Sequence, residues 1–264
     1  MAHIVDNYPL FYDAMNEHSL AIAGLNFVNN AYYHKVQDEK KNIAQFEFIS
    51  YILANYKNID EIIKDFDNLN IVDTQYNKSY PTASLHWIIK DTHKCIVIES
   101  TKDGMFYYEN KLGVLTNNPP FNYQLENLKN YQYLTNEDNN INEQIDYSRG
   151  KGAVGLPGDL SSKSRFVRVA FTTYFSIADD TEEANVNQFF HILDSVNQTR
   201  GCCKVNDKYE ITIYSSCMNL KQSIYYYKTY DNFTINGIKL KNENLDTIDL
   251  ITFEIKQDKI NYQN

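Results

Sequence analysis

The sequence predicts an α+β fold with antiparallel sheets. Blocks of short β-rich runs alternate with blocks of helical periodicity, and no strand–helix–strand spacing indicates a parallel sheet. The 264 residues include 43% apolar side chains, which is enough for a substantial buried core. Neither a repeat nor a linker composition is visible, so residues 1–264 are predicted to form a single domain.

The N-terminal half is predicted to contain a hairpin, two helices and a meander. Residues 8–27 have the pattern of two strands around a polar turn at 16–18. Helical spacing of apolar side chains predicts a helix over 43–56, and Asn58 with Glu61 forms a capping-box signature before a second helix. Polar or glycine-containing turns then separate four predicted strands, over 85–89, 95–99, 105–109 and 113–116.

The C-terminal half is predicted to contain three helices and then four strands. Apolar residues recur at helical spacing over 123–134, 164–177 and 184–196. Strands are predicted over 209–215, 223–230, 233–240 and 250–255.

Composition excludes several classes of function. A net charge of −9 argues against a nucleic-acid partner, which needs a basic face. No apolar stretch has the length of a membrane span and the N-terminus has no signal-peptide pattern, so a cytoplasmic protein without a membrane partner is expected. The cysteines show no CxxC pair, and we expect neither a metal nor a cofactor; they are Cys95, Cys202, Cys203 and Cys217.

The sequence contains the letters of a nucleotide-binding motif, but not the strand and helix that the motif needs around it. The letters GKGAVG at 150–155 match GxGxxG, which in context would place backbone amides against a pyrophosphate. The preceding residues 136–149 are polar and predict a loop where the motif needs a buried strand, and Pro157 stands where a helix would have to run. A loop is therefore the preferred interpretation. The GxSxG motif of serine hydrolases does not occur.

Two polar residues have both a structural and a functional interpretation. In GVLTNNPPF an apolar strand runs into Asn117 and is stopped by Pro119. The side chain of Asn117 could form an Asx turn, or it could be a fixed N–H donor that stabilises an oxyanion, and the sequence leaves both open. Arg200 ends a helix with Gly201 as its cap, where an arginine also meets the helix dipole favourably.

Six segments together resemble the choloylglycine hydrolase family, which contains bile salt hydrolases and penicillin V acylases. They are DAMNEHSLAIAGLNF, LHWII, GVLTNNPPFNYQL, GLPGDLSSKSRFVRVAF, NQFFHILDSV and IYYYKTYDN, and they occur in the family's order along essentially the whole chain. The resemblance implies an N-terminal nucleophile hydrolase fold with four αββα layers, usually assembled as a homotetramer.

The resemblance also implies a site. In the family an N-terminal Cys attacks the amide carbonyl while its own α-amino group serves as the base. Asn26 matches the first oxyanion residue through its backbone N–H, Asn117 matches the second through its side chain, and Arg200 matches an active-site arginine. Asn at position 26, where the penicillin branch has Tyr, is similar to the bile salt branch. The loop that lines the acyl pocket in relatives corresponds to Tyr80, Ala83 and Leu85.

One departure from the family concerns the start of the chain. Met1 aligns with an internal residue of the family, so we expect the first segment, about sixty residues or four to five strands, to be absent together with the nucleophilic Cys. None of the four cysteines carries a free α-amino group. Three alternatives follow: a start further upstream, which would restore a hydrolase of linear amides such as conjugated bile salts or penicillin V; a short protein that binds an amide without cleaving it; or an inactive remnant.

Overall fold

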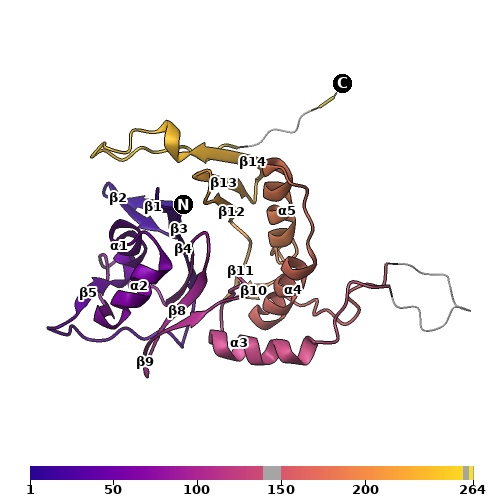
Figure 1. The fold of residues 1–264 in the computed structure, drawn as a ribbon, viewed down its shortest axis with the longest axis horizontal. Coiled ribbons are helices and arrows are strands. Elements are labelled where there is room, and N and C mark those ends of the chain that lie inside the picture. The colour runs from indigo at the N-terminus through magenta and orange to yellow at the C-terminus, as the bar shows by residue number, and fades with distance from the viewer. Residues whose placement is uncertain (139–149, 258–261, 264) are drawn as a thin grey trace, which may run out of the picture.

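Two antiparallel sheets lie next to each other in the middle of the molecule, and helices lie on the outer side of each (Figure 1). The structure is a computed structural model that describes residues 1–138, 150–257 and 262–263. One helical layer packs against the N-terminal sheet on the left of Figure 1, and the other packs against the C-terminal sheet on the right. The α+β class with antiparallel main sheets is confirmed.

The N-terminal sheet has five antiparallel strands in the order β3-β4-β7-β8-β9. Their bounds are β3 (Asp13–Met15), β4 (Ala21–Asn26), β7 (Leu85–Lys90), β8 (Cys95–Thr101) and β9 (Gly104–Glu109). A separate antiparallel pair precedes it, formed by β1 (Ala2–Val5) and β2 (Tyr8–Phe11). The register places Asn26 opposite Leu85 and Leu25 opposite His86, which fixes the end of β4 against the start of β7.

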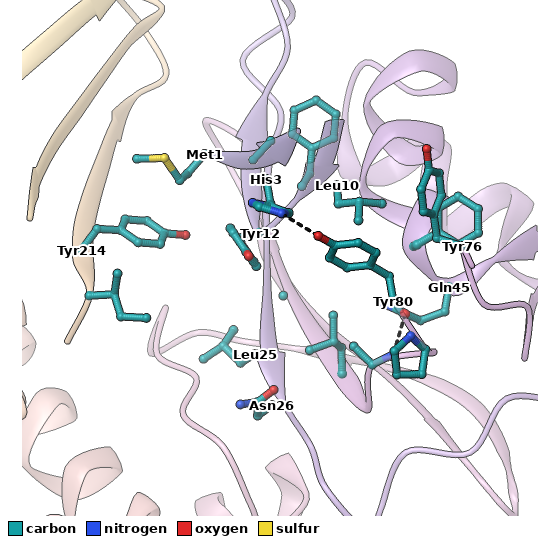
Figure 2. A pocket seen from close by; sticks show the side chains of 18 of the residues that line it. Met1, His3, Leu10, Tyr12, Leu25, Asn26, Gln45, Tyr76, Tyr80 and Tyr214 are labelled. Atoms are coloured by element: carbon teal, nitrogen blue, oxygen red, sulfur yellow. Dashed lines mark hydrogen bonds between the residues drawn. The ribbon is translucent and has the colours of Figure 1, made fainter. Parts of the chain in front are cut away.

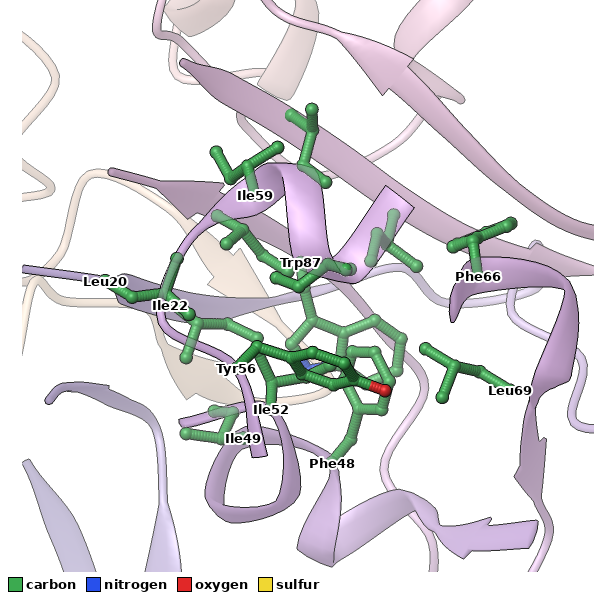
Figure 3. Close-up of a cluster of buried hydrophobic side chains, with 14 of the residues drawn as sticks. Leu20, Ile22, Phe48, Ile49, Ile52, Tyr56, Ile59, Phe66, Leu69 and Trp87 are labelled. Atoms are coloured by element: carbon green, nitrogen blue, oxygen red, sulfur yellow. The ribbon is translucent and has the colours of Figure 1, made fainter. Parts of the chain in front are cut away.

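Side chains alternate between the two faces of the sheet along β7 and β8, so one face contacts the core and the other faces the site. Trp87 and Ile98 point to one face, where α1 (Phe48–Asn55) and α2 (Ile59–Asp65) cover them. Asn58 caps α2 as predicted, because its Oδ1 accepts a hydrogen bond of 3.0 Å from the Glu61 N–H. Trp87 is fully buried beside Phe48 at the centre of the cluster in Figure 3. Side chains between these positions point to the opposite face, because the strand period is two.

The C-terminal half supplies the second sheet and its helices. The sheet has the order β12-β13-β14, with β12 (Tyr214–Asn219), β13 (Ile224–Thr229) and β14 (Asn232–Lys239). Its helices are α4 (Ser162–Phe175) and α5 (Glu182–Asp194), while α3 (Phe121–Leu128) joins the two halves. Ser161 and Thr181 are the N-caps of α4 and α5, accepting from backbone N–H groups with their hydroxyl oxygens.

A buried carboxylate links the two sheets. Asp13 on β3 accepts hydrogen bonds at Oδ2 from Tyr214 (2.8 Å) and Ser216 (2.9 Å), and at Oδ1 from Tyr225 (2.6 Å). The Met1 ammonium donates to the same Oδ1 at 2.8 Å. Burial and the Asp13 charge raise the pKa of both tyrosines, so these hydroxyls stay protonated donors.

Several predicted boundaries differ from the structure. Residues 113–116 are an extended loop, because Gly113 has a φ of +66° and the Val114 carbonyl accepts from the Asn110 side chain at 2.9 Å. Residues 250–255 form no strand; they run on as an irregular segment beyond β14. The predicted helix over 123–134 starts earlier, at Phe121, and its last turn is a 3-10 helix over Lys129–Tyr131.

Three small strand pairs were not predicted. The first is the antiparallel pair of β1 and β2, since residues 2–5 were not predicted as a strand. The second is parallel, between β5 (Lys41–Ala44) and β6 (Leu69–Val72), and the third is the antiparallel pair of β10 (Lys204–Val205) and β11 (Lys208–Tyr209). Most of the loop predicted over 136–149 lies outside the described residues. In the described part of the chain, no helix combines the length and the apolar character needed to cross a membrane.

Candidate active site

The side-chain amide of Asn117 is held from two directions. Its Oδ1 accepts from Arg165 Nη2 at 2.7 Å, and its Nδ2 donates to the Asn26 carbonyl at 3.0 Å. An amide nitrogen carries two hydrogens, so one N–H of Asn117 remains available for another acceptor. Among the described residues the side chain bonds to these partners far along the chain rather than to the backbone two residues on. The structure therefore favours the oriented donor over the Asx turn.

Asn26 ends β4 with its backbone N–H directed away from β7. The Phe27 N–H donates to the Ser84 carbonyl at 2.8 Å, on the side of β7. Successive backbone N–H groups of an antiparallel strand point to opposite edges of that strand. The N–H of Asn26 therefore faces the edge of β4 away from β7. At that edge the pairing with β3 stops at Asp13 opposite Ala23. The backbone N–H and carbonyl of Asn26 therefore face the same edge of β4, and the side-chain nitrogen of Asn117 lies 3.0 Å from that carbonyl.

The loop that carries Asn117 is fixed over its whole length. Gln124 Nε2 lies 3.4 Å from the Asn117 carbonyl and 3.2 Å from the Asn118 carbonyl. Asn118 Nδ2 donates to the Val28 carbonyl at 2.7 Å. A loop bonded both to α3 and to the segment after β4 does not need to be ordered when a ligand binds.

A cavity of about 810 Å³ opens beside the two asparagines. Figure 2 shows tyrosine side chains arranged around it, with Asn26 at the lower edge of this view. Tyr80, Ala83 and Leu85 all line this cavity, while their expected role in binding an acyl group stays a prediction. The other main lining residues are Leu10, Phe11, Tyr12, Leu25, Phe46, Tyr76 and Tyr214.

Hydrogen bonds hold the loop of residues 80–85 in place. The Tyr33 hydroxyl donates to the Ala83 carbonyl at 2.8 Å and accepts from the Leu85 N–H at 2.9 Å. Gln45 accepts from the Ala83 N–H at 3.0 Å, and Tyr80 Oη lies 3.0 Å from His3 Nε2. Burial raises the pKa of Tyr33, so its hydroxyl remains a donor at all physiological pH values.

A second cavity, of about 900 Å³, adjoins the same asparagines from the other side. Asn26 and Asn117 line both cavities, so they form part of the wall between them. Arg165, Cys203 and Glu210 line only the second, which makes it the charged one. Burial lowers the pKa of Arg165 and the Glu210 charge opposes that effect, while the hydrogen bond from Cys203 to Glu210 raises the pKa of the thiol.

Arg200 lies away from this arrangement. It is exposed, its backbone N–H donates to the Tyr230 hydroxyl at 3.0 Å, and its guanidinium stands 5.4 Å from the centre of the Tyr230 ring. It lines neither of the two cavities. The cation that contacts Asn117 is Arg165, in the first turn of α4, a segment for which helical spacing from residue 164 was predicted but no site residue was named. This contact depends on how α4 docks beside the Asn117 loop, and local sequence does not contain that information.

Around Asn117 the described residues provide hydrogen-bond donors and a cation, Arg165, which are groups suited to binding a carbonyl oxygen. They contain no cluster of three or more His, Cys, Asp or Glu side chains that could hold a metal ion. Cys95 and Cys217 are buried, and burial raises the pKa of each to about 11, so neither is a ready nucleophile.

Comparisons with known proteins agree with the fold and with the residues assembled here. The family model for linear amide C–N hydrolases, choloylglycine hydrolase family, matches residues 1–253. A bile salt hydrolase/transferase from Lactiplantibacillus plantarum is 50% identical over 260 residues, and one from Clostridium perfringens is 40% identical over 262. Each alignment covers 96% of this chain and 80% of the relative.

Solved structures give the same result. A mutant of the conjugated bile acid hydrolase from Clostridium perfringens superposes with a TM-score of 0.92 and 39% identity, covering 100% of this chain and 83% of the other. Penicillin V acylase from Agrobacterium tumefaciens has a TM-score of 0.69 at 20% identity, over 87% of this chain and 66% of its own, and so shares the fold. The N-terminal nucleophile hydrolase fold implied by the resemblance is confirmed. This chain belongs to the choloylglycine hydrolase family of linear amide C–N hydrolases.

Proposed function

We propose that the protein acts on the amide bond of conjugated bile salts, and that residues 1–264 supply the substrate pocket and the oxyanion donors. The observation that carries the proposal is the position of Asn117. Its amide is fixed by Arg165 and by the Asn26 carbonyl, and it stands where an apolar, tyrosine-rich cavity meets a charged one.

The first cavity suits the acyl part of such a substrate. Its volume of about 810 Å³ falls within the usual range of small-molecule sites. Leu25, Phe46 and Leu85 offer apolar surface, and Tyr76 and Tyr80 add hydroxyl groups at the wall. A body that is mostly hydrocarbon with a few hydroxyl groups, as in a bile acid, matches that combination.

The amide group of the substrate is proposed to lie at the shared wall. Its carbonyl oxygen would accept from the free N–H of Asn117 and from the backbone N–H of Asn26. Donors fixed before the reaction stabilise the oxyanion of a tetrahedral intermediate without reorganisation. Arg165 polarises the Asn117 amide by binding its oxygen, and this makes the N–H a stronger donor. The amine part of the substrate then faces the second cavity.

The nucleophile is proposed to be the N-terminal Cys that the resemblance implies, and no cysteine of residues 1–264 occupies that position. Position 1 is Met, and its ammonium binds the Asp13 carboxylate at 2.8 Å. We therefore expect the 264-residue chain alone to bind conjugated bile salts without cleaving them. A chain that begins with Cys would complete the mechanism, since the thiolate attacks and its α-amino group takes the proton.

Calorimetric titration of the 264-residue protein with glycocholate, combined with an assay for released glycine, tests this proposal. We expect saturable binding, binding about tenfold or more weaker in Leu85→Trp because the indole fills the first cavity, and no release of glycine. Penicillin V serves as the competing ligand and is expected to bind more weakly. Asn122→Ala, at an exposed position of α3, is the control.

Two results would contradict the proposal. The first is the absence of glycocholate binding. The second is binding that Leu85→Trp does not affect. Release of glycine by this chain that Asn117→Ala abolishes would support the proposed reaction and the role of Asn117, and it would contradict only the expectation that residues 1–264 lack the nucleophile.

A further inference from the structure

His86 lies between the two segments that carry the oxyanion donors. It is fully buried on β7, on the face opposite Trp87, and its register partner on β4 is Leu25, next to Asn26. A fully buried imidazole needs partners for both ring nitrogens, and each partner found here belongs to the wall of the site or supports it.

The Nε2 atom of His86 holds the Asn117 loop. It lies 2.8 Å from the carbonyl oxygen of Thr116, the residue immediately before Asn117. A carbonyl oxygen can only accept, so Nε2 carries the hydrogen and donates. Thr116 is itself buried, and its hydroxyl donates to the Ser162 carbonyl at 3.1 Å, in the first turn of α4. The backbone before Asn117 is therefore fixed from both β7 and α4.

The ring of His86 also supports the segment that carries Asn26. It stacks on Phe27 with the ring centres 4.3 Å apart and the planes inclined by 6°. Phe27 is fully buried and follows Asn26 directly. A change in the tilt of the imidazole would therefore move the supports of both donors together.

Glu99 completes the arrangement from β8. Its Oε1 lies 3.0 Å from His86 Nδ1 and accepts from the Phe121 N–H at 2.9 Å. Thr116 and Phe121 flank the loop 117–120, so the pair holds that loop at both ends. Because Nε2 already carries a hydrogen, the proton between Nδ1 and Oε1 is shared by one histidine and one glutamate, and the pair has no net charge.

The other carboxylate oxygen of Glu99, Oε2, is buried without a hydrogen-bond partner among the described residues. A buried, unpaired carboxylate oxygen is costly, and an apolar pair of the same volume would fill this space without that cost. A buried pair that lowers the stability of the fold in this way is expected where the pair has a role other than stabilising the fold.

We propose that His86 and Glu99 form a positioning pair that aligns the N–H of Asn117 with the N–H of Asn26. This inference rests on the proposed role of the two asparagines. Neither His86 nor Glu99 lines the two cavities, so the pair acts through Thr116, Phe27 and Phe121 and does not touch a substrate.

Two substitutions at one position separate positioning from simple packing. In His86→Gln the amide nitrogen reaches the place of Nε2 and keeps the bond to Thr116. In His86→Asn it reaches only the place of Nδ1, so the bond to Glu99 is kept and the Thr116 carbonyl loses its donor. Ile89→Ala is the matched control, since Ile89 is fully buried on the same strand but in the cluster beneath α1 and α2.

The measurement is the side-chain amide resonance of Asn117 in asparagine-labelled protein, together with glycocholate affinity and urea unfolding for each variant. We expect His86→Asn to shift or broaden the Asn117 resonance and to weaken binding about tenfold, the effect of one unpaired buried carbonyl. We expect His86→Gln and Ile89→Ala to lose stability while the Asn117 resonance and the affinity stay near their original values.

Two outcomes would overturn the inference. One is an unchanged Asn117 resonance in His86→Asn, and the other is an equal shift in all three variants. If the unaltered protein binds no glycocholate, the proposed function fails, while the resonances still decide whether His86 positions Asn117. Should His86→Asn not fold, titration of the unaltered protein decides: the His86 ring N–H resonance must then respond to glycocholate together with Asn117, and no response overturns the inference.

Discussion

The Asn117 loop (residues 116–120) and the Arg200 segment (residues 198–203) both carry residues that sequence reasoning placed in the active site, yet Asn117 and Arg200 differ in their exposure and in their contacts. Thr116 is buried, and its carbonyl accepts a hydrogen bond from His86 on β7. Asn117 bonds to α4 and to the end of β4. Arg200 is exposed, and its contacts are with the Tyr230 side chain.

This difference shows what makes a polar residue suitable for binding a developing charge. A donor that is already oriented needs no reorganisation when the charge appears, and burial of its supports strengthens each bond. An exposed arginine at a turn is surrounded by water and loses side-chain entropy when it is fixed. Four experiments can break or sharpen the comparison.

The largest effect is expected for Asn117→Ala in a chain that begins with the implied Cys. Loss of one oxyanion donor costs about 2 to 4 kcal/mol of transition-state stabilisation, a loss in rate of about a hundredfold or more. Glycine release from glycocholate measures it, with Arg200→Ala as the paired variant, for which an unchanged rate is expected. A similar rate loss in both variants would remove the distinction between the two regions.

Arg165→Ala and Arg200→Ala should separate the two arginines in stability. Removing Arg165 leaves Asn117 Oδ1 without its charged donor in a partly buried place, which costs about 1.5 to 3 kcal/mol of unfolding free energy. Removing Arg200 should change it by less than about 0.5 kcal/mol, as at other exposed positions. Urea unfolding measures both, and equal losses would contradict the account.

Tyr33→Phe and Tyr230→Phe compare two hydroxyls, one bonded to the loop of residues 80–85 and one bonded to Arg200. The Tyr33 hydroxyl bonds to both Ala83 and Leu85, so its removal should cost about 1 kcal/mol and weaken glycocholate binding. The Tyr230 hydroxyl accepts one bond at a partly exposed site, and its loss should leave binding unchanged. Calorimetry on the two variants decides, and weaker binding in Tyr230→Phe would assign Arg200 to the site.

The smallest effect concerns Cys203 in the Arg200 segment. Its hydrogen bond to Glu210 raises the thiol pKa, which lowers the fraction of reactive thiolate near neutral pH. Glu210→Gln, in a Cys202→Ser background, should therefore speed alkylation of Cys203 by iodoacetamide, and the difference should vanish at a pH above both thiol pKa values. Mass spectrometry follows the reaction. Slower alkylation in the variant would reverse the sign of the effect.

Many of the helices and strands could be predicted from the sequence, because their local sequence patterns agree with the way they pack in the structure. Apolar alternation predicted β7, β8 and β9, and the Asn58 cap placed the start of α2 correctly. The strand predicted over 113–116 failed because Gly113 takes a left-handed conformation and side chains satisfy the backbone there. Pairing of β5 with β6 joins residues far apart in sequence, which no local pattern reveals.

The site was predictable only where a residue type matched a family motif. Asn26, Asn117, Tyr80, Ala83 and Leu85, which were named from the resemblance, all line one cavity, and the roles that the resemblance implies for them stay predictions. Arg165 was not found, because its segment predicted only a helix and its contact with Asn117 spans 48 positions. No sequence motif singled out His86, which is fully buried, and only the structure shows which segments it contacts.

A crystal structure of the 264-residue protein with glycocholate tests the central claim most directly. The account predicts the steroid body in the cavity between Tyr80 and Leu85, with the amide carbonyl within hydrogen-bonding distance of both Asn117 Nδ2 and the Asn26 backbone nitrogen, and the glycine part toward Arg165. A ligand bound elsewhere, or one whose amide faces away from both asparagines, would contradict it.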